Sequence, residues 1–213
     1  MSRSVYSLVL SDDVIRAVDR AAYAMNTSRS NLINQILAEY VSYTTPEKRM
    51  KDIFDSLTAL IGANEPFLIQ SQGSDAMLSI RSPLQVKYNP TIKYTVELFR
   101  DKASNLGELR VMTRTQSGAL LEQLEEFFLL FCAVETAYSS IPPQYQIGKG
   151  RFIRKFVMKD AAMNSDEIGT AIARFIQCMD AALKAYFNAP VYQRKAAVEE
   201  IYRAYLNDCP MGL

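Results

Sequence analysis

Five cations in one short segment are the residues whose types and spacing best suit binding chemistry. Residues 144–159 contain no Asp or Glu, so these positive charges have no acid beside them in the sequence. Helical spacing would place Arg151, Arg154 and Lys155 on one face, where clustered cations can bind phosphate. The alternative is a solvated helix face whose two phenylalanines lie in the core. The five cations are Lys149, Arg151, Arg154, Lys155 and Lys159.

Catalytic and metal-binding side chains are scarce in this composition. The chain has no histidine, which removes the commonest general base and the commonest metal ligand. Its three cysteines, Cys132, Cys178 and Cys209, lie far apart, so their spacing fits neither a metal site nor a disulfide framework. The sequence offers no nucleophile motif, no phosphate-binding glycine loop and no acids clustered at catalytic spacing. We therefore expect a protein that is not an enzyme and that uses no cofactor or metal.

The opening of the chain predicts one short strand followed by two short amphipathic helices. Residues 4–10 are rich in β-branched, aromatic and aliphatic side chains, which favour an extended strand. Ser11 suits the N-cap of the first helix, and Asn26 suits the left-handed turn that ends it. Thr27 or Ser28 can cap the second helix. The apolar stripes are Val14, Val18, Ala21, Ala22 and Met25 on the first helix, and Leu32, Ile33, Ile36, Leu37, Tyr40 and Val41 on the second.

Such a unit cannot bury enough apolar surface by itself. A lone strand leaves its backbone amides and carbonyls unpaired, and two short helices cover little surface. A dimer whose two strands pair antiparallel above four helices solves both problems. In residues 1–43 the chain resembles the ribbon-helix-helix superfamily of bacterial repressors, the MetJ, Arc and CopG type. The residues that carry the resemblance are Leu8, Val9, Leu10 and Ser11, the turn Met25, Asn26, Thr27, Ser28, Arg29 and Ser30, and Leu32, Ile33, Ile36, Leu37 and Tyr40.

The resemblance implies how such a dimer would contact double-stranded DNA. In the family the paired strands lie in the major groove, and their outward side chains meet base edges. The outward positions here are Arg3, Val5, Ser7 and Val9. Polar side chains usually occupy these positions, so Val5 and Val9 restrict the readout to apolar contacts such as a thymine methyl. The family's clamp on the DNA backbone, at the start of the second helix, corresponds to Thr27, Ser28, Arg29 and Ser30.

The remainder of the chain changes its hydrophobic period twice, and these changes suggest domain boundaries. We expect a ribbon-helix-helix domain in residues 1–45, a linker helix in 46–64 and a C-terminal domain in 65–213. Alternating apolar residues predict an antiparallel β-meander with strands at about 67–116, and helical periods predict helices at about 117–207. The expected fold class is α+β, with the meander packed against a C-terminal helical bundle.

Charge and hydropathy limit the kinds of partner. The chain has 24 basic and 23 acidic residues and a formal net charge of +1, so any DNA-binding surface must be local. An odd number of dispersed cysteines indicates a reducing compartment. No apolar run is long enough to span a bilayer, and no signal peptide precedes the strand. We expect a cytoplasmic protein with no membrane partner.

The leading hypothesis is a dimeric DNA-binding protein, a transcriptional repressor of a bacterium or a mobile element. Its expected partners are double-stranded DNA and a second copy of the chain, with two dimers forming a tetramer as an open alternative. The C-terminal domain would sense a small-molecule effector, join dimers or bind a protein. The alternative function is a protein–protein assembly module that uses the ribbon only to dimerise. An enzyme in residues 65–213 is the least favoured alternative.

Overall fold

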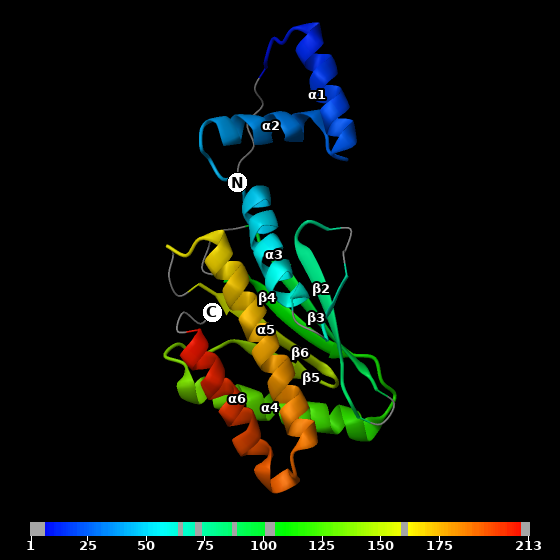
Figure 1. Ribbon diagram of the computed structural model, residues 1–213, viewed down its shortest axis with the longest axis vertical. Coiled ribbons are helices and arrows are strands. Elements are labelled where there is room, and N and C mark those ends of the chain that lie inside the picture. The colour runs from blue at the N-terminus through cyan, green and yellow to red at the C-terminus, as the bar shows by residue number, and fades with distance from the viewer. Residues whose placement is uncertain are drawn as a thin grey trace. The chain divides into compact units, whose positions relative to one another are not determined.

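The chain divides into two compact units, Met1–Arg49 and Met50–Leu213, in a computed structural model (Figure 1). Within the described part, six α-helices occur together with a six-stranded antiparallel sheet, which confirms a mixed helix-and-sheet fold. The boundary between the units falls inside helix α3 (Pro46–Gly62). The structure describes residues 7–63, 66–70, 74–86, 89–100, 105–158 and 162–209.

The first unit contains two helices, α1 (Asp12–Ala24) and α2 (Arg29–Tyr40). Asn26 has a φ of 50°, so the left-handed turn predicted between the helices is confirmed. The side chain of Ser28 caps α2 by accepting a hydrogen bond from the backbone N–H of Asn31 at 3.2 Å. The two helices and the turn between them therefore lie where the sequence places them.

The strand expected at residues 4–10 is not confirmed. Met1–Tyr6 lie outside the described residues, and residues 7–11 make no strand pairing before α1 begins. Ser11 occupies the N-cap position of α1, but its hydroxyl makes no capping hydrogen bond. A strand needs a neighbour for its backbone hydrogen bonds, and the described part of one chain supplies none at this point. The described chain thus opens with helices and not with a ribbon.

The second unit is built on the antiparallel sheet. Its strands are β1 (Leu68–Gln70), β2 (Met77–Pro83), β3 (Thr91–Leu98), β4 (Asn105–Thr113), β5 (Tyr145–Gly148) and β6 (Arg151–Val157). They lie in the order β1-β2-β3-β4-β6-β5, so a meander of four strands is extended by a hairpin that joins it beside β4. The meander matches the prediction for residues 67–116, whereas the hairpin was not predicted.

The helix expected in residues 144–159 is wrong, because this segment forms the hairpin β5–β6. Phe152, Arg154 and Phe156 lie on the covered side of β6, so their spacing follows the period of a strand. Gly150, with a φ of 66°, provides the tight turn between the two strands. Within the predicted meander, residues 84–86 form no strand, and residues 87–88 lie outside the described residues.

The helices of this unit cover one face of the sheet. Helices were predicted at about 117–207, and this part of the chain contains α4 (Gly118–Tyr138), α5 (Ser165–Asn188) and, after a short 3-10 helix, α6 (Arg194–Asp208). The ring of Phe128 on α4 stacks on Phe152 of β6, with centroids 5.1 Å apart. The hydroxyl of Tyr94 on β3 donates to Asp180 of α5 at 3.0 Å. Both helices therefore pack on the same side.

Helix α3, expected as a linker, contributes a buried face to the core of the second unit. Its buried residues are Met50, Ile53, Leu57 and Ile61. It lies beside α5 in Figure 1, and the two helices approach closely at Gly169. A Cβ atom at that glycine would lie 2.5 Å from the carbonyl oxygen of Ile53 and 2.8 Å from the Cβ of Ser56. Only a glycine permits this approach.

Gly169→Ala should therefore destabilise the second unit, although alanine favours a helix. We expect a loss of about 1–3 kcal/mol from overpacking, measured by urea unfolding. Gly118→Ala in α4 is the matched control, because a Cβ there would meet nothing within 4 Å. This control should keep or slightly raise stability. Equal effects of the two substitutions would contradict the close packing of α3 on α5.

Candidate nucleic-acid interface

The predicted phosphate clamp lies at the exposed N-terminus of α2. Ser28 and Ser30 are exposed, and the hydroxyl of Thr27 accepts a hydrogen bond from the side chain of Asn31 at 3.0 Å. A capped but exposed helix start presents backbone N–H groups and a partial positive charge to solvent. The four residues Thr27, Ser28, Arg29 and Ser30 are thus brought together in a geometry that suits an anion.

Arg29 is not free within this clamp. Its guanidinium donates two hydrogen bonds to the carboxylate of Asp19 on α1, each at 2.5 Å. The hydrogen bond and the negative charge of Asp19 raise the pKa of Arg29 above its ordinary value. Both side chains are about half exposed, so the pair is accessible to a partner. Asp19 thus offsets the positive charge that the sequence assigns to the clamp, a contact that sequence reasoning missed.

Of the four residues predicted to contact bases, two lie within the part of the chain that the structure describes. Arg3 and Val5 lie outside the described residues. Ser7 and Val9 are exposed, and the Val9 side chain is fully so, at 101%. Residues 7–10 are consequently available for pairing with another chain or for contact with a partner.

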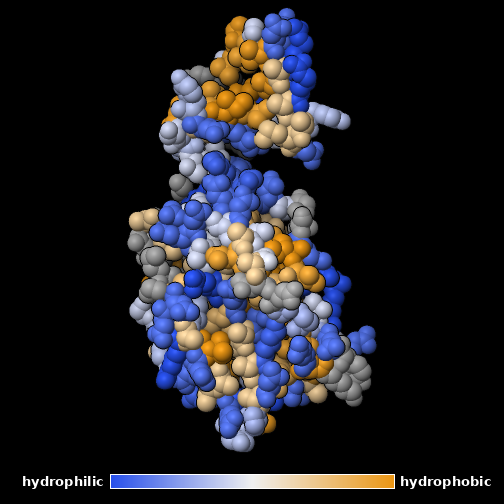
Figure 2. Space-filling model, in the orientation of Figure 1, coloured by the Kyte–Doolittle hydropathy of each residue, from blue (hydrophilic) through white to orange (hydrophobic). Residues whose placement is uncertain are grey.

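The first unit leaves most of its apolar side chains uncovered. Among its described residues, the buried hydrophobic ones are Ala22, Leu32 and Ala38. Figure 2 shows hydrophobic side chains gathered over α1 and α2. The exposed large hydrophobic residues of this unit are Leu8, Val9, Leu10, Val14, Tyr23, Met25, Ile36, Leu37, Tyr40, Val41 and Tyr43. We call this set the uncovered apolar surface of the first unit.

The five cations predicted as a secondary patch do not form one surface. Lys149 and Arg151 are exposed at the turn of the hairpin and Lys155 is half-buried, whereas Arg154 is only 3% exposed. Lys159 lies outside the described residues. The prediction that Arg151, Arg154 and Lys155 share a helix face is wrong, because neighbours on a strand point to opposite sides.

Arg154 instead forms a buried ion pair with Glu135 of α4. Its guanidinium donates to Glu135 Oε1 at 2.7 and 2.9 Å and lies 4.3 Å from the ring centroid of Phe175. Tyr145 donates its hydroxyl to the other carboxylate oxygen at 2.8 Å. Burial, followed by the charge of Glu135, raises the pKa of the Cys132 thiol to about 12. The sequence signal for this pair was Glu135, an acid that follows the apolar run of residues 127–134.

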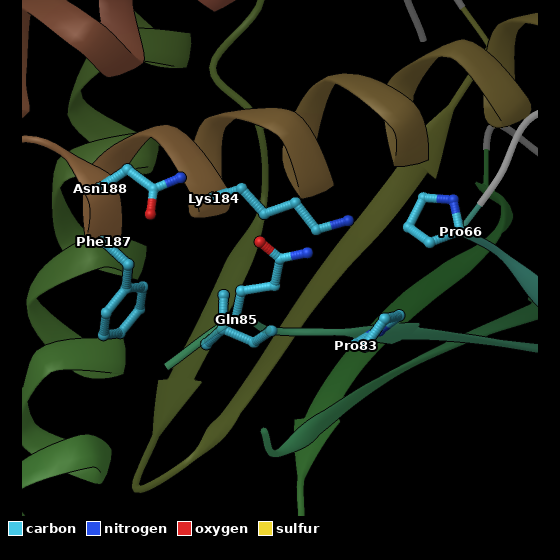
Figure 3. Close-up of a pocket in the computed structure, with 7 residues that line it drawn as sticks. Pro66, Pro83, Gln85, Lys184, Phe187 and Asn188 are labelled. Atoms are coloured by element: carbon cyan, nitrogen blue, oxygen red, sulfur yellow. The ribbon is translucent and has the colours of Figure 1, made fainter. Parts of the chain in front are cut away.

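A small polar pocket, also missed by sequence reasoning, lies between β2 and α5 (Figure 3). Lys184 of α5 donates to Asp180 at 2.5 Å and to the hydroxyl of Ser82 at 2.9 Å. Asp180 therefore offsets the lysine charge, and the volume of about 130 Å³ suits only a small polar molecule. The lining residues are Pro66, Pro83, Leu84, Gln85, Lys184, Phe187 and Asn188.

No group of three or more Cys, Asp or Glu side chains in the described part is placed to hold a metal ion. No helix there is both long and apolar enough to cross a membrane.

Comparison of the chain with protein-family models, with curated proteins and with solved structures found no match in any of the three. The resemblance to ribbon-helix-helix repressors therefore depends on the N-terminal residues quoted above.

The buried pair predicts an asymmetric response to substitution. Arg154→Met leaves the Glu135 carboxylate buried without a cation, so unfolding free energy should fall by about 3–5 kcal/mol. The deficit should shrink between about pH 7 and pH 5: an unpaired buried carboxyl has a raised pKa in the folded state, so the folded state binds the extra proton. Urea unfolding at several pH values measures both effects.

Two variants control this experiment. The double variant Glu135→Leu, Arg154→Met leaves no buried charge and should recover most of the lost stability. Lys51→Met breaks an exposed ion pair with Asp55 and should cost less than about 1 kcal/mol. A double variant no more stable than Arg154→Met would contradict the ion-pair account.

Proposed function

We propose that the first unit dimerises with the same unit of a second chain and binds double-stranded DNA, and that the protein represses transcription by occupying an operator. The observation that carries the proposal is the uncovered apolar surface of the first unit. The resemblance of residues 1–43 to ribbon-helix-helix repressors supplies the arrangement in which that surface is covered.

The first unit exposes far more large hydrophobic residues than it buries, and this supports a second copy of the unit as its partner. A unit of this size is marginally stable even when its apolar residues are buried. Here Leu32 is the only large hydrophobic side chain among the unit's described residues that is buried. Contiguous exposed apolar patches on a monomer mark interaction sites. A second copy with the same patch would cover both and would offer residues 7–10 a strand to pair with.

The clamp at α2 supports DNA as the ligand of the dimer. Phosphate groups bind at helix N-termini, where backbone N–H groups and the helix dipole both favour an anion. Arg29 can exchange the carboxylate of Asp19 for a phosphate oxygen, because both side chains are accessible to solvent. Phosphate contacts would position the dimer, whereas Ser7 and Val9 would supply limited readout of bases.

The assembly module is retained as a second candidate because specific observations favour it. Val9 at an outward position is apolar, and Arg29 already has an anionic partner on α1. Both features would suit a unit that only dimerises. In that case the second unit, with its pocket beside Lys184, would bind the physiological partner.

Binding to mixed genomic DNA fragments at low and moderate salt tests the proposal. The wild type should bind and weaken steeply with salt, because bound cations release counterions from DNA. Arg29→Ala, Ser30→Ala should bind roughly tenfold more weakly, equivalent to about 1.4 kcal/mol. Asp19→Asn should bind more tightly, because it frees Arg29 and removes a negative charge beside the clamp.

The two variants should change the DNA affinity in opposite directions, which a general loss of structure would not produce. Circular dichroism and the oligomeric state of each variant control for loss of structure. Equal DNA binding by all three proteins would remove the clamp from the account. If none of them binds DNA while all remain folded dimers, the assembly module replaces the repressor.

A further inference from the structure

One face of the six-stranded sheet carries a local excess of positive charge. The helices α4 and α5 cover the opposite face, on which Ile80, Tyr94 and Val111 are buried. Because side chains alternate along a strand, the intervening residues share the other side, which we call the open face. Its charged residues within the paired strands are Arg81, Lys93, Glu97, Glu108, Arg110, Arg151 and Lys155.

These residues are five cations and two anions, an excess of three positive charges on one face. The whole chain has a net charge of only +1. The excess is therefore a property of this face, and it is not expected from the composition. Such local segregation is what an electrostatic binding surface requires in a protein of neutral balance.

The strand register divides the open face into a compensated part and an uncompensated part. In the compensated part, Arg110 pairs with Glu97 at 2.6 Å and with Glu108 at 2.5 Å. Lys155 lies directly opposite Glu108 across β4 and β6. The acids of the open face are consequently matched by cations beside them.

The uncompensated part is a single row that crosses all six strands. Arg81 is opposite Lys93, Lys93 is opposite Met112, and Met112 is opposite Arg151. We call these four residues, together with Leu68 and Gly148 at the two ends, the basic row. The row contains no acid.

The basic row holds its cations close together, and no acid of the described residues pairs with them. In the described part, no ion pair involves Arg81, Lys93 or Arg151. Arg81 and Lys93 are directly opposite on neighbouring strands, an arrangement in which like charges repel. An anionic partner would remove this repulsion. Arg81 and Arg151 are both exposed, so such a partner can reach them.

The dimensions of the row fit a phosphate backbone. Arg81 and Arg151 are separated by three strand spacings, roughly 14 Å at the usual distance between strands. A duplex carries one phosphate charge per about 1.7 Å of its axis, so this span faces several phosphates. Three cations at fixed spacing on a rigid sheet can therefore contact phosphates without rearrangement.

The residue types of the open face favour double-stranded nucleic acid over other polyanions. The paired-strand residues on this face include no aromatic ring, whereas single-strand binders stack bases on aromatic side chains. The exposed apolar side chains of the row are Leu68 and Met112, too few to insert into a bilayer.

We infer that the basic row binds the phosphate backbone of double-stranded DNA, as a second contact surface located in the second unit. The inference goes beyond the proposed function, because it depends on the sheet of residues 50–213 and needs neither the ribbon nor the clamp at α2. The basic row also differs from the secondary patch expected from the sequence. It shares Arg151 with that patch, it lacks the buried Arg154, and it includes Arg81 and Lys93 from strands that are distant in the sequence.

The test compares two full-length triple variants that lose the same charge. The row variant is Arg81→Gln, Lys93→Gln, Arg151→Gln. The control variant is Lys51→Gln, Arg174→Gln, Lys195→Gln, which removes three cations from α3, α5 and α6. The measurement is fluorescence anisotropy with a mixed-sequence duplex of about 40 base pairs, from about 50 to about 200 mM salt.

The row variant should bind the duplex at least tenfold more weakly at the lowest salt. Its slope of log affinity against log salt should be smaller in magnitude by about 2.7, or about 0.9 for each lost phosphate contact. The control variant should stay within about twofold of the wild type, because its cations lie off the row. Urea unfolding should show no loss of stability in the row variant, since two repelling cations become neutral.

Every outcome decides between the proposals. Equal binding by the row and control variants overturns the inference and leaves the clamp at α2 untouched. Suppose that the row variant binds the duplex normally but no longer binds anionic vesicles of phosphatidylserine. This result also overturns the inference and assigns the basic row to a membrane surface. If the row variant loses DNA binding while the variant Arg29→Ala, Ser30→Ala keeps it, the inference about the basic row is supported and the proposed clamp at α2 is rejected. A wild type that binds no duplex overturns both.

Discussion

The need to cover apolar side chains is the constraint on which both units of this chain depend, and they meet it differently. The second unit meets it internally. Helix α5 is buried over more than half of its residues, between the sheet and the neighbouring helices, and Gly169 lets α3 approach it to van der Waals contact. The first unit has two short helices and buries a single large hydrophobic residue among those described, Leu32. We propose that a second copy of the same unit covers the apolar side chains that remain exposed.

Charged side chains are also distributed differently on the covered and the open face of the sheet. On the covered side of the sheet, each described cation is matched: Arg154 by Glu135, and Lys184 by Asp180. A buried charge without such a partner would be too costly to keep. On the open face, Arg81 and Arg151 of the basic row are exposed and Lys93 is half-buried, and the solvent beside them screens the repulsion between their charges. The second unit therefore pairs the charges that it buries and leaves an excess of positive charge on one outer face.

Local periodicity was enough to predict the helices α4 and α5 and the meander, because apolar spacing and turn residues are local signals. It failed at the hairpin β5–β6, where Arg151, Arg154 and Lys155 fit helical spacing while Phe152, Arg154 and Phe156 alternate as in a strand. It could not place partners that depend on register between distant segments. The basic row joins residues 81, 93, 112 and 151, and nothing in the sequence near any one of them indicates the others. The start of α2 after Ser28 was predicted correctly from local capping chemistry, but the contact of Arg29 with Asp19 depends on how two helices pack.

Sedimentation equilibrium of the full chain over a hundredfold range of concentration tests most directly whether the first unit is completed by a second copy. We expect a dimer for the wild type and a monomer for the double variant Ile36→Glu, Leu37→Glu, which places two charges in the uncovered apolar surface. Hydrogen exchange of α1 and α2 should be slow in the dimer and fast in the monomeric variant. A wild type that stays monomeric at every concentration, with α1 and α2 protected from exchange, would contradict the account.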